Sequence, residues 1–558
     1  MDEGFRAEMV AGYAFNEPVI ALGVPMLGTD LLPEVHVSVP LSRVNRHGLI
    51  AGATGTGKTK TLQLFAGQLS AAGVPVFAVD VKGDLSGIGA AGNAADPKVL
   101  ERCQQMGWTF VAAAHPIQVL SLSGNVGGHV RASVSSFGPL LMGKVLDLNE
   151  TQVSVLSMVF HYCDQNQLPL LDLADLRTTL KYLGSDDGKV ILEDLGGIAP
   201  ATLGVILRAI VTLEQDGSSV FFGEPEFDVN DLLTMTPDGR GVISLLEVSD
   251  IMDKPRLYAT FVLWMLARLY TALPEVGDLP KPKLAFFFDE AHLLFKDAST
   301  ALLDQVERTA RLIRSKGVGV YFVTQAPQDV PSPILAQLGN RVQHALRAFT
   351  PDDADALRKT ARTFPVTTHY NVEQTIMSLG IGEALVTVLS PRGVPTPLAA
   401  TRLLPPDSRM APLSPDELNA LAAASPLTLK YGTTVDPQSA HEIITARIAA
   451  AHAAVGSVPG AVSAPGAAGA WAPPAMTPAQ QQREIARQAR EIAAQQRAED
   501  VARRAAQRDA KAQATAAIRA ERERQRTMQT AMRTAGRVVT SRGGQSLIRG
   551  LFGILGGK

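Results

Sequence analysis

Cysteine is scarce in this sequence, since Cys103 and Cys163 are the only two among 558 residues. Two cysteines outside any CxxC pair cannot form a disulfide framework or a four-cysteine zinc site, so both are expected to be structural thiols. No stretch approaches the ~20 consecutive apolar residues that a membrane-spanning helix needs. The N-terminal stretch MDEGFRAEMV is acidic, and no signal-peptide apolar region follows it. These absences predict a cytoplasmic protein with no transmembrane segment.

A strong net charge is also missing, because the formal charge is only −2 at pH 7. The charge is unevenly distributed, however. From Pro478 to Lys558 there are 17 Lys and Arg against 7 Asp and Glu, which gives this segment about +10 and leaves about −12 on the residues before it. With 46% hydrophobic residues the chain can bury a sizeable core. The composition therefore predicts an acidic globular body followed by a basic tail.

The most informative stretch is the octapeptide GATGTGKT at Gly52–Thr59, which matches the phosphate-loop (Walker A) pattern at every position. The apolar run Gly48–Ala51 before it has the length of a buried strand end. After the loop, apolar residues recur at near-helical spacing, namely Leu62, Leu64, Phe65 and Leu69. A strand, a glycine-rich loop and a helix are therefore expected in succession, which is the context that makes this pattern functional.

In this arrangement, backbone N–H groups and the positive end of the helix dipole face a polyphosphate. Lys58 is expected to reach the β- and γ-phosphates, and Thr59 to present its hydroxyl to Mg²⁺. ATP and Mg²⁺ are thus the predicted cofactors. The predicted nucleotide-binding residues are Gly52, Ala53, Thr54, Gly55, Thr56, Gly57, Lys58 and Thr59.

Two adjacent carboxylates end a second apolar run, LAFFFDEAH. A buried strand explains the apolar residues, but Asp289 and Glu290 at its carboxyl end would be costly to desolvate without a cation. A Walker B pair explains both features. Asp289 is expected to belong to the Mg²⁺ shell, and Glu290 to polarise the attacking water.

Another strand-like run, VGVYFVTQ, ends in Thr324 and Gln325. Polar residues at a strand end often only begin a loop, but beside a Walker B strand Gln325 is a candidate γ-phosphate sensor. Upstream, Arg308, Arg311 and Arg314 are spaced by three along one predicted helix. They form either a solvated helix face or a source of the cation that stabilises transition-state charge, commonly donated by a neighbouring subunit.

Strand-like runs alternate with helical stretches along the chain, which predicts an α/β fold with a mainly parallel sheet. Helices are expected on both faces, with ligands at the carboxyl ends of the strands. Besides the runs already described, the apolar segments lie at 74–85, 241–248 and 383–390.

Several motifs together resemble the bacterial HerA-like helicase family within the HerA and FtsK ATPases: RHGLIAGATGTGKT, DVKGDL, FFFDEAHLLF, RLIRSKGVGVYFVTQ, LGNRVQHALRAFTP and PPDSRM. The resemblance implies a RecA-like P-loop ATPase that forms a hexameric ring and translocates double-stranded DNA. By position, Lys58, Thr59, Asp289, Glu290 and Gln325 match the family's nucleotide lysine, magnesium hydroxyl, Walker B pair and sensor.

The resemblance also singles out arginines. Arg314 matches a segment in which HerA relatives carry an arginine that acts on the neighbouring subunit's site, and Arg46 falls into place twelve residues before Lys58. Arg341, in LGNRVQ, is a further candidate. Only about 45 residues precede the phosphate loop, fewer than the N-terminal barrel of archaeal HerA requires.

The expected organisation has a RecA-like core with a long helical insertion, followed by a flexible linker and a basic helical tail. The expected segments are a short β-rich lead-in at 1–45, the ATPase core at 46–410 with the insertion at about 87–239, a helical extension at 411–452, an Ala/Gly/Pro linker at 453–478 and the basic tail at 479–558.

Two functions stay open at this point. The first is a ring-forming DNA translocase or helicase-like motor. The alternative is an ATP-dependent switch or assembly factor without DNA translocation, which would use its basic tail on a protein or an anionic membrane surface. The apolar residues of the terminal QSLIRGLFGILGGK would suit an amphipathic anchor in that case. A non-catalytic scaffold is disfavoured by the intact lysine, carboxylates and sensor.

Overall fold

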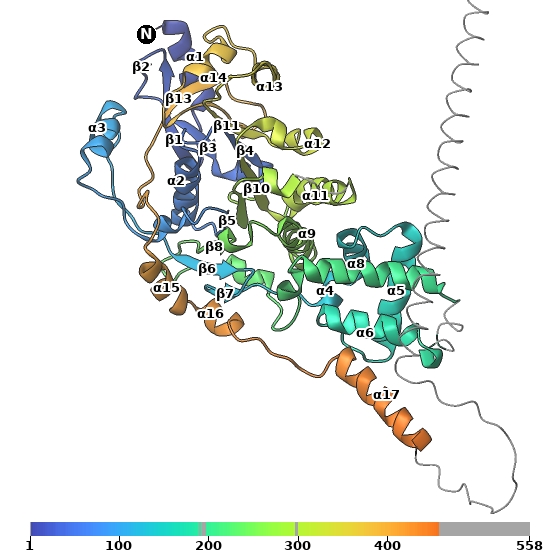
Figure 1. Ribbon diagram of the computed structural model, residues 1–558. Coiled ribbons are helices and arrows are strands. Elements are labelled where there is room, and N and C mark those ends of the chain that lie inside the picture. Colours follow the sequence, from blue (N-terminus) through green and yellow to red (C-terminus); the bar gives the residue numbers. More distant parts are fainter. Residues whose placement is uncertain (1, 189–190, 192–196, 296–299, 457–558) are drawn as a thin grey trace, which may run out of the picture. The chain divides into compact units, whose positions relative to one another are not determined.

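A computed structural model of the chain describes residues 2–188, 191, 197–295 and 300–456 (Figure 1). They belong to one compact unit, Met1–Val458. The strands of this part are β1 (Val19–Leu27), β2 (Asp30–Leu31), β3 (Val37–Pro40), β4 (Gly48–Ala51), β5 (Val76–Asp80), β6 (Ile117–Ser121), β7 (Gly128–His129), β8 (Ile243–Glu247), β9 (Leu284–Phe288), β10 (Val318–Thr324), β11 (Asn340–His344), β12 (Glu383–Thr387) and β13 (Ala399–Leu403).

The helices of this part are α1 (Glu3–Tyr13), α2 (Lys58–Ala71), α3 (Pro97–Gln105), α4 (Val134–Val145), α5 (Glu150–Gln165), α6 (Leu173–Leu183), α8 (Pro200–Gln215), α9 (Pro255–Ala272), α10 (His292–Phe295), α11 (Thr300–Ile313), α12 (Ser332–Leu335), α13 (Pro351–Ala361), α14 (Val372–Ser378), α15 (Pro415–Ala423), α16 (Pro426–Tyr431) and α17 (Ala440–Gly456). Short 3₁₀ helices are η1 (Leu41–Arg46), η2 (Ser86–Gly89), η3 (Ser218–Phe221), η4 (Val229–Leu233), η5 (Ser249–Ile251), η6 (Arg314–Lys316) and η7 (Pro327–Asp329). None of the described helices is long and apolar enough to cross a membrane.

All the described strands belong to one sheet, in the order β2-β1-β13-β12-β11-β4-β10-β9-β5-β8-β6-β7, with β3 paired to β1. From β11 through β4, β10, β9, β5, β8 and β6 to β7, neighbouring strands are parallel. Beyond β11 the sheet continues with antiparallel pairs. The predicted α/β fold with a mainly parallel sheet is thus confirmed. Its parallel strands end at one common edge, where ligands of such folds bind.

Both faces of the sheet are buried, because successive side chains of a strand point to opposite sides. On β9, Phe286 and Phe288 join one hydrophobic core, whereas Ala285 and Phe287 join the other. Apolar residues of α9 and α11 cover the first face, and those of α1 and α2 cover the second. This two-sided burial explains why the central strands read as continuous apolar runs rather than as alternating patterns.

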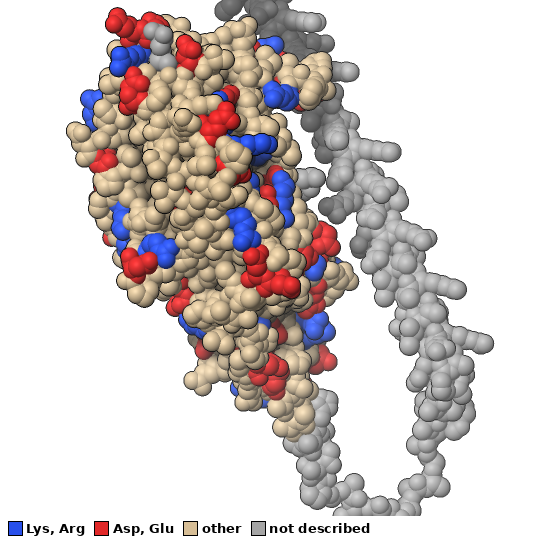
Figure 2. Space-filling model, turned by 90° about the vertical axis from the view of Figure 1, so that its left-hand side faces the viewer, with Lys and Arg blue, Asp and Glu red and all other residues tan. Residues whose placement is uncertain are grey.

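Charged side chains of both signs are mixed on one face of the molecule (Figure 2). On the face drawn in Figure 2, Lys and Arg side chains lie interspersed with Asp and Glu. This face therefore presents no broad field of one sign.

The lead-in contains a helix that its composition did not predict. The Asp2 side chain caps α1 by accepting a hydrogen bond from the Gly4 N–H, and Phe5, Met9 and Tyr13 all face the core at a spacing of four residues. The expected strands follow, and β1 joins the main sheet by pairing with β13. The lead-in thus extends the core sheet.

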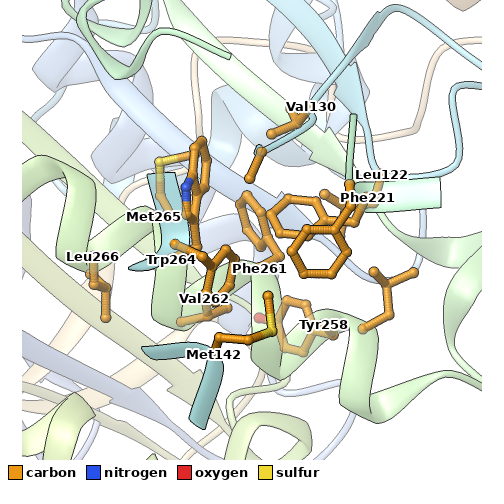
Figure 3. Close-up of a cluster of buried hydrophobic side chains, with 14 of the residues drawn as sticks. Leu122, Val130, Met142, Phe221, Tyr258, Phe261, Val262, Trp264, Met265 and Leu266 are labelled. Carbon is orange, nitrogen blue, oxygen red and sulfur yellow. The ribbon is translucent and has the colours of Figure 1, made fainter. Parts of the chain in front are cut away.

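The insertion between β5 and β8 is not purely helical, because β6 and β7 lengthen the sheet before α4 begins. Helices α4, α5, α6 and α8 then gather beside the β7 end of the sheet (Figure 1). Phe221 of this segment packs edge-on against Phe261 and Trp264 of α9, with ring centroids 6.1 and 5.6 Å apart (Figure 3). The insertion therefore shares the hydrophobic core of the main sheet.

Helices α15, α16 and α17 lie in the segment expected as a helical extension, and α17 continues to Gly456, past the expected start of the linker at 453. The rest of the linker and the basic tail lie outside the described residues.

Candidate nucleotide-binding site

The phosphate loop connects the end of β4 to the first residue of α2, as expected. Gly52, Gly55 and Gly57 have φ values of 155°, 78° and 111°, which side chains with a Cβ rarely adopt. A Cβ on Gly52 would also lie 2.5 Å from the His344 Cβ. Glycine is therefore required here for the tight turn that aims backbone N–H groups at the start of α2.

Lys58 is 7% exposed and lies across the loop that precedes it. Its Nζ donates hydrogen bonds to the main-chain oxygens of Gly52, at 2.5 Å, and Ala53, at 3.1 Å. Burial lowers the pKa of this lysine. A buried ammonium whose hydrogen-bond partners among the described residues are neutral carbonyls, beside a helix N-terminus, fits a polyphosphate anion. Thr59, half-buried, follows in the first turn of α2.

Strand pairing brings the other predicted residues to the same edge. Thr324 pairs with Ala51 of β4, and Phe322 pairs with Phe288 of β9. Gln325 consequently follows β10, which lies next to the phosphate-loop strand β4, and the Walker B carboxylates follow β9, on the other side of β10. This common edge is hereafter called the carboxyl edge.

Asp289 is 3% exposed, and its Oδ1 accepts a hydrogen bond of 2.9 Å from the Glu290 N–H. Its Oδ2 has no hydrogen-bond partner within the described chain. Burial, followed by the charge of Glu290, raises the pKa of Asp289 to about 7. An orphaned, buried carboxylate oxygen beside the phosphate loop fits a divalent cation, because Mg²⁺ prefers carboxylate oxygen ligands.

Glu290 is 4% exposed and has a left-handed backbone, with φ 45°. Its Oε1 forms an ion pair with the Lys82 Nζ, while its Oε2 lies 3.5 Å from Gln325 Nε2 and 3.3 Å from His292 Nδ1. Burial opposes ionisation of this carboxyl, but Lys82, with smaller contributions from His292 and Gln325, holds its pKa below the ordinary value. Glu290 is therefore a charged hydrogen-bond acceptor beside Gln325.

Thr324, the residue before Gln325, already has a hydrogen-bond partner in its own chain. Thr324 Oγ1 donates to Asp329 Oδ2 at 2.6 Å, which closes the turn after β10. Gln325 is thus the member of the pair that faces Glu290.

Residues 28–512 of the chain match the family model of the helicase HerA-like C-terminal domain. The chain belongs to this family. Taken with the Walker A and Walker B geometry, membership makes it a P-loop ATPase of the HerA type.

Solved structures similar to this HerA-family chain include the plasmid coupling protein TrwB in complex with the non-hydrolysable ATP analogue ADPNP. The two chains are 16% identical, the match covers 72% of this chain and 98% of that chain, and the TM-score is 0.46. TrwB in complex with ADP and Mg²⁺ is 16% identical, the match covers 74% of this chain and 94% of that chain, and the TM-score is 0.45. VirB4 of Thermoanaerobacter pseudethanolicus is 14% identical, the match covers 73% of this chain and 99% of that chain, and the TM-score is 0.41. No curated protein matches the sequence.

The candidate arginines of this HerA-family chain lie at the opposite edge of the sheet. Arg46 ends η1, just before β4, and Arg314 begins η6, just before β10. A seven-residue strand such as β10 is about 23 Å long, so Arg314 is far from its own chain's phosphate loop. Arg314 is exposed and forms no ion pair within the described residues, whereas Arg46 pairs with Asp278 at 3.1 Å.

Arg341 and Arg311 have partners within the chain. Arg341 donates to the carbonyls of Leu338, Thr363 and Leu335, which gives it a structural role in the chain's own fold. Arg311 pairs with Glu307 on the same helix.

Two features of the site had no prediction attached to them. Lys82, which lies in the DVKGDL motif, contacts Glu290 because β5 neighbours β9. His344 lies buried beside the loop, with its Nε2 3.0 Å from Thr61 Oγ1, because β11 neighbours β4. Burial, with the charge of Lys58, lowers the pKa of His344 to about 3, so its imidazole is neutral.

A buried acidic pair lies farther along the carboxyl edge, where Asp80 and Glu247 end neighbouring strands. Asp80 accepts four backbone hydrogen bonds from the turn that follows it. Glu247 is 6% exposed, and its Oε1 has no partner within the described residues. Burial, followed by the charge of Asp80, raises the pKa of Glu247 to about 8.

Replacing Glu247 by glutamine is expected to stabilise the protein at high pH. The folded-state pKa near 8 exceeds the unfolded value of about 4.3, so the folded chain holds an extra proton between them and stability falls as the pH rises through this window. Glutamine stays neutral, so thermal unfolding at about pH 8 should show a gain on the order of 1–3 kcal/mol that shrinks towards about pH 5. An equal effect at both pH values would contradict this assignment.

Proposed function

We propose that this chain is an Mg²⁺-dependent ATP hydrolase that assembles into a hexameric ring and translocates double-stranded DNA. The observation that supports the proposal most is the division of the predicted residues between two edges. Lys58, Asp289, Glu290 and Gln325 converge on the carboxyl edge, whereas Arg46 and Arg314 lie at the opposite edge. A subunit arranged in this way offers a nucleotide site on one side and cations for a neighbour's site on the other.

The phosphate loop would hold the β- and γ-phosphates of ATP through its backbone N–H groups and Lys58. Thr59 and the unpartnered Oδ2 of Asp289 would hold Mg²⁺, which supplies positive charge against the transferred phosphoryl group. Glu290, kept ionised by Lys82, would accept a hydrogen bond from the attacking water. Gln325 would orient the same water or sense the γ-phosphate, since it already lies beside Glu290.

In this proposal the catalytic core spans residues 46–410, and the insertion at about 87–239 is part of the same body. The basic tail at 479–558 would add sequence-independent contacts to DNA phosphates. The body carries about −12, so a DNA-binding surface on it would be confined to a local stripe such as a ring pore.

Duplex DNA is expected to raise the ATPase rate severalfold at low salt, and the stimulation should fade as salt rises from about 50 to 200 mM, because phosphate contacts release counterions. Steady-state hydrolysis with duplex and single-stranded DNA of equal length measures both effects, and a Lys58→Ala preparation corrects for contaminating ATPases. A rate indifferent to DNA at low salt would instead favour the ATP-dependent switch. A chain ending at Gly456 tests whether the basic tail carries the stimulation.

A further inference from the structure

The turn that follows β5 is held in place by one buried carboxylate. Asp80 accepts hydrogen bonds of 2.8–3.2 Å from four successive backbone N–H groups, those of residues 82–85. Gly83, inside this turn, has a φ of 71°, which glycine adopts without strain. The DVKGDL motif therefore fixes the backbone from which the Lys82 side chain extends.

Lys82 reaches from this turn to the Walker B glutamate. Strands β5 and β9 are neighbours, and the Lys82 Nζ forms its ion pair with Glu290 Oε1. The Lys82 side chain is 48% exposed, whereas that of Glu290 is 5% exposed. An ammonium has three N–H donors, and among the described residues Glu290 is the hydrogen-bond acceptor for one of them. Two donors thus remain for an anion that enters from solvent.

A second ammonium lies close to that of Lys82. Burial lowers the pKa of Lys58 most, Glu290 raises it, and the charge of Lys82 lowers it again. The two ammonium groups, one from α2 and one from the turn after β5, are therefore close enough to repel each other. Like charges are costly to bring together unless an anion lies between them, and a γ-phosphate is such an anion.

The position of Glu290 defines where a γ-phosphate would lie relative to Lys82. A general base lies within about 2.6–3.2 Å of the water that it activates, and that water lies about 3–3.5 Å from the atom that it attacks. The γ-phosphate is therefore one water molecule away from Glu290. Lys82 contacts the same carboxylate and has a flexible four-carbon stem, so its ammonium can contact a γ-phosphate oxygen without releasing Glu290.

We propose that Lys82 binds the γ-phosphate of ATP within its own chain, opposite Lys58, while its contact with Glu290 holds this base beside the attacking water. The inference rests on the proposed ATPase function and deepens it, because it assigns the discrimination of ATP from ADP to the DVKGDL motif. It also separates two cations of the site. Lys82 would act on the nucleotide of its own chain, whereas Arg314 would act on that of a neighbour.

The contact would strengthen during hydrolysis. As the water oxygen bonds to the γ-phosphorus and the bond to the ADP oxygen breaks, the water gives a proton to Glu290 and ADP leaves as an anion. Negative charge on the γ-phosphate oxygens then lies beside the Lys82 ammonium, which stabilises it in a site that is already organised before the reaction.

Two substitutions separate the charge of Lys82 from its shape. Lys82→Ala removes the ammonium but keeps the backbone N–H that Asp80 binds, and Lys82→Arg keeps a positive charge. Each is made in the full wild-type chain and in the Glu290→Gln chain, whose slow turnover allows ATP affinity to be measured at equilibrium. Lys430→Ala is the matched control, because Lys430 is 51% exposed and pairs with Asp231 at 2.8 Å, on α16.

Equilibrium binding of ATP and of ADP, each with magnesium, is the decisive measurement. In the Glu290→Gln chain, Lys82→Ala should weaken ATP binding by about tenfold or more, the loss expected for one hydrogen bond to a charged group, and leave ADP affinity unchanged. Lys82→Arg should keep most of the ATP affinity. With Glu290 intact, Lys82→Ala should lower kcat by about 10²–10³-fold. Lys430→Ala should alter none of these values.

Three results would overturn the inference. Equal loss of ATP and ADP affinity would mean that Lys82 acts on the phosphate loop or the fold, and unchanged ATP affinity of Lys82→Ala in the Glu290→Gln chain would mean that it acts through Glu290 alone. Faster hydrolysis by Lys82→Ala would show that the ion pair restrains the base. Failure of the wild-type chain to bind or hydrolyse ATP would instead refute the proposed ATPase function itself.

Discussion

Glu290→Gln protein is expected to bind ATP with near wild-type affinity but to hydrolyse it about 10²–10⁴-fold more slowly, the usual contribution of a general base. Glutamine keeps the size of the side chain and can still contact Gln325, but it has no carboxylate to polarise water. Lys58→Ala, in contrast, is expected to lose both binding and hydrolysis, because the lysine neutralises phosphate charge in the ground state as well as the transition state. Nucleotide-affinity and single-turnover measurements separate the two effects.

Glu214→Gln provides the matched control. Glu214 is also a mostly buried, ion-paired carboxylate, 2.9 Å from Arg177, but it lies on α8 in the insertion. Its amide variant should retain wild-type turnover. If Glu290→Gln lost binding as severely as Lys58→Ala, the catalytic carboxylate would have been misassigned; unaltered turnover would exclude Glu290 as the base.

The sequence could identify those site residues that belong to short, contiguous motifs. A phosphate loop needs closely spaced glycines followed by lysine and threonine, so Gly52–Thr59 can be recognised without knowledge of the fold. Asp289 and Glu290 can be recognised because two carboxylates at the end of a buried apolar strand are costly to desolvate without a cation. The mainly parallel sheet also followed from the alternation of strand-like and helical segments.

Contacts that depend on strand order were beyond the sequence. Lys82 holds Glu290 only because β5 and β9 are neighbours, although 208 residues separate the two side chains. His344 faces the phosphate loop only because β11 pairs with β4. No periodicity or motif along the chain encodes such pairings.

Helix α1 was missed for a different reason. Its apolar residues recur every fourth position, but the stretch is short and lies among acidic residues. Only burial against the sheet shows why Phe5, Met9 and Tyr13 are apolar. Most of the stability of a helix this short comes from such packing rather than from intrinsic propensity.

Strand topology also narrows the choices for Arg314. The sequence left open a solvated helix face, action within the chain and action on a neighbour's site. A side chain at the start of β10 lies at the opposite edge from its own Lys58 and Glu290, which argues against action within the chain. Its exposure and lack of an ion pair in the described residues leave the guanidinium available to a neighbour. We therefore expect Arg314 to complete the site of the adjacent subunit.

Arg314→Ala and Lys58→Ala chains are each expected to be nearly inactive alone, with the arginine variant reduced by about 10³-fold or more, yet to recover hydrolysis when mixed. An Arg314→Ala subunit retains a complete Walker site, and a Lys58→Ala neighbour can supply the missing guanidinium. At equal proportions about a quarter of the interfaces pair an intact loop with an intact arginine, which sets the scale of the recovery if sites act independently.

The recovery requires co-expression or subunit exchange, and it should vanish on dilution below the assembly concentration. Arg311→Ala is the matched control, because Arg311 lies three residues away but pairs with Glu307 of its own helix; this variant should stay near wild-type activity. Near-wild-type activity of Arg314→Ala alone would show that Arg314 is a solvated surface residue with no role in hydrolysis. An inactive Arg314→Ala that no mixture rescues would contradict action between subunits. In either case Arg46, which precedes β4 at the same edge, is the next arginine to mix with Lys58→Ala, because its position satisfies the same geometric argument.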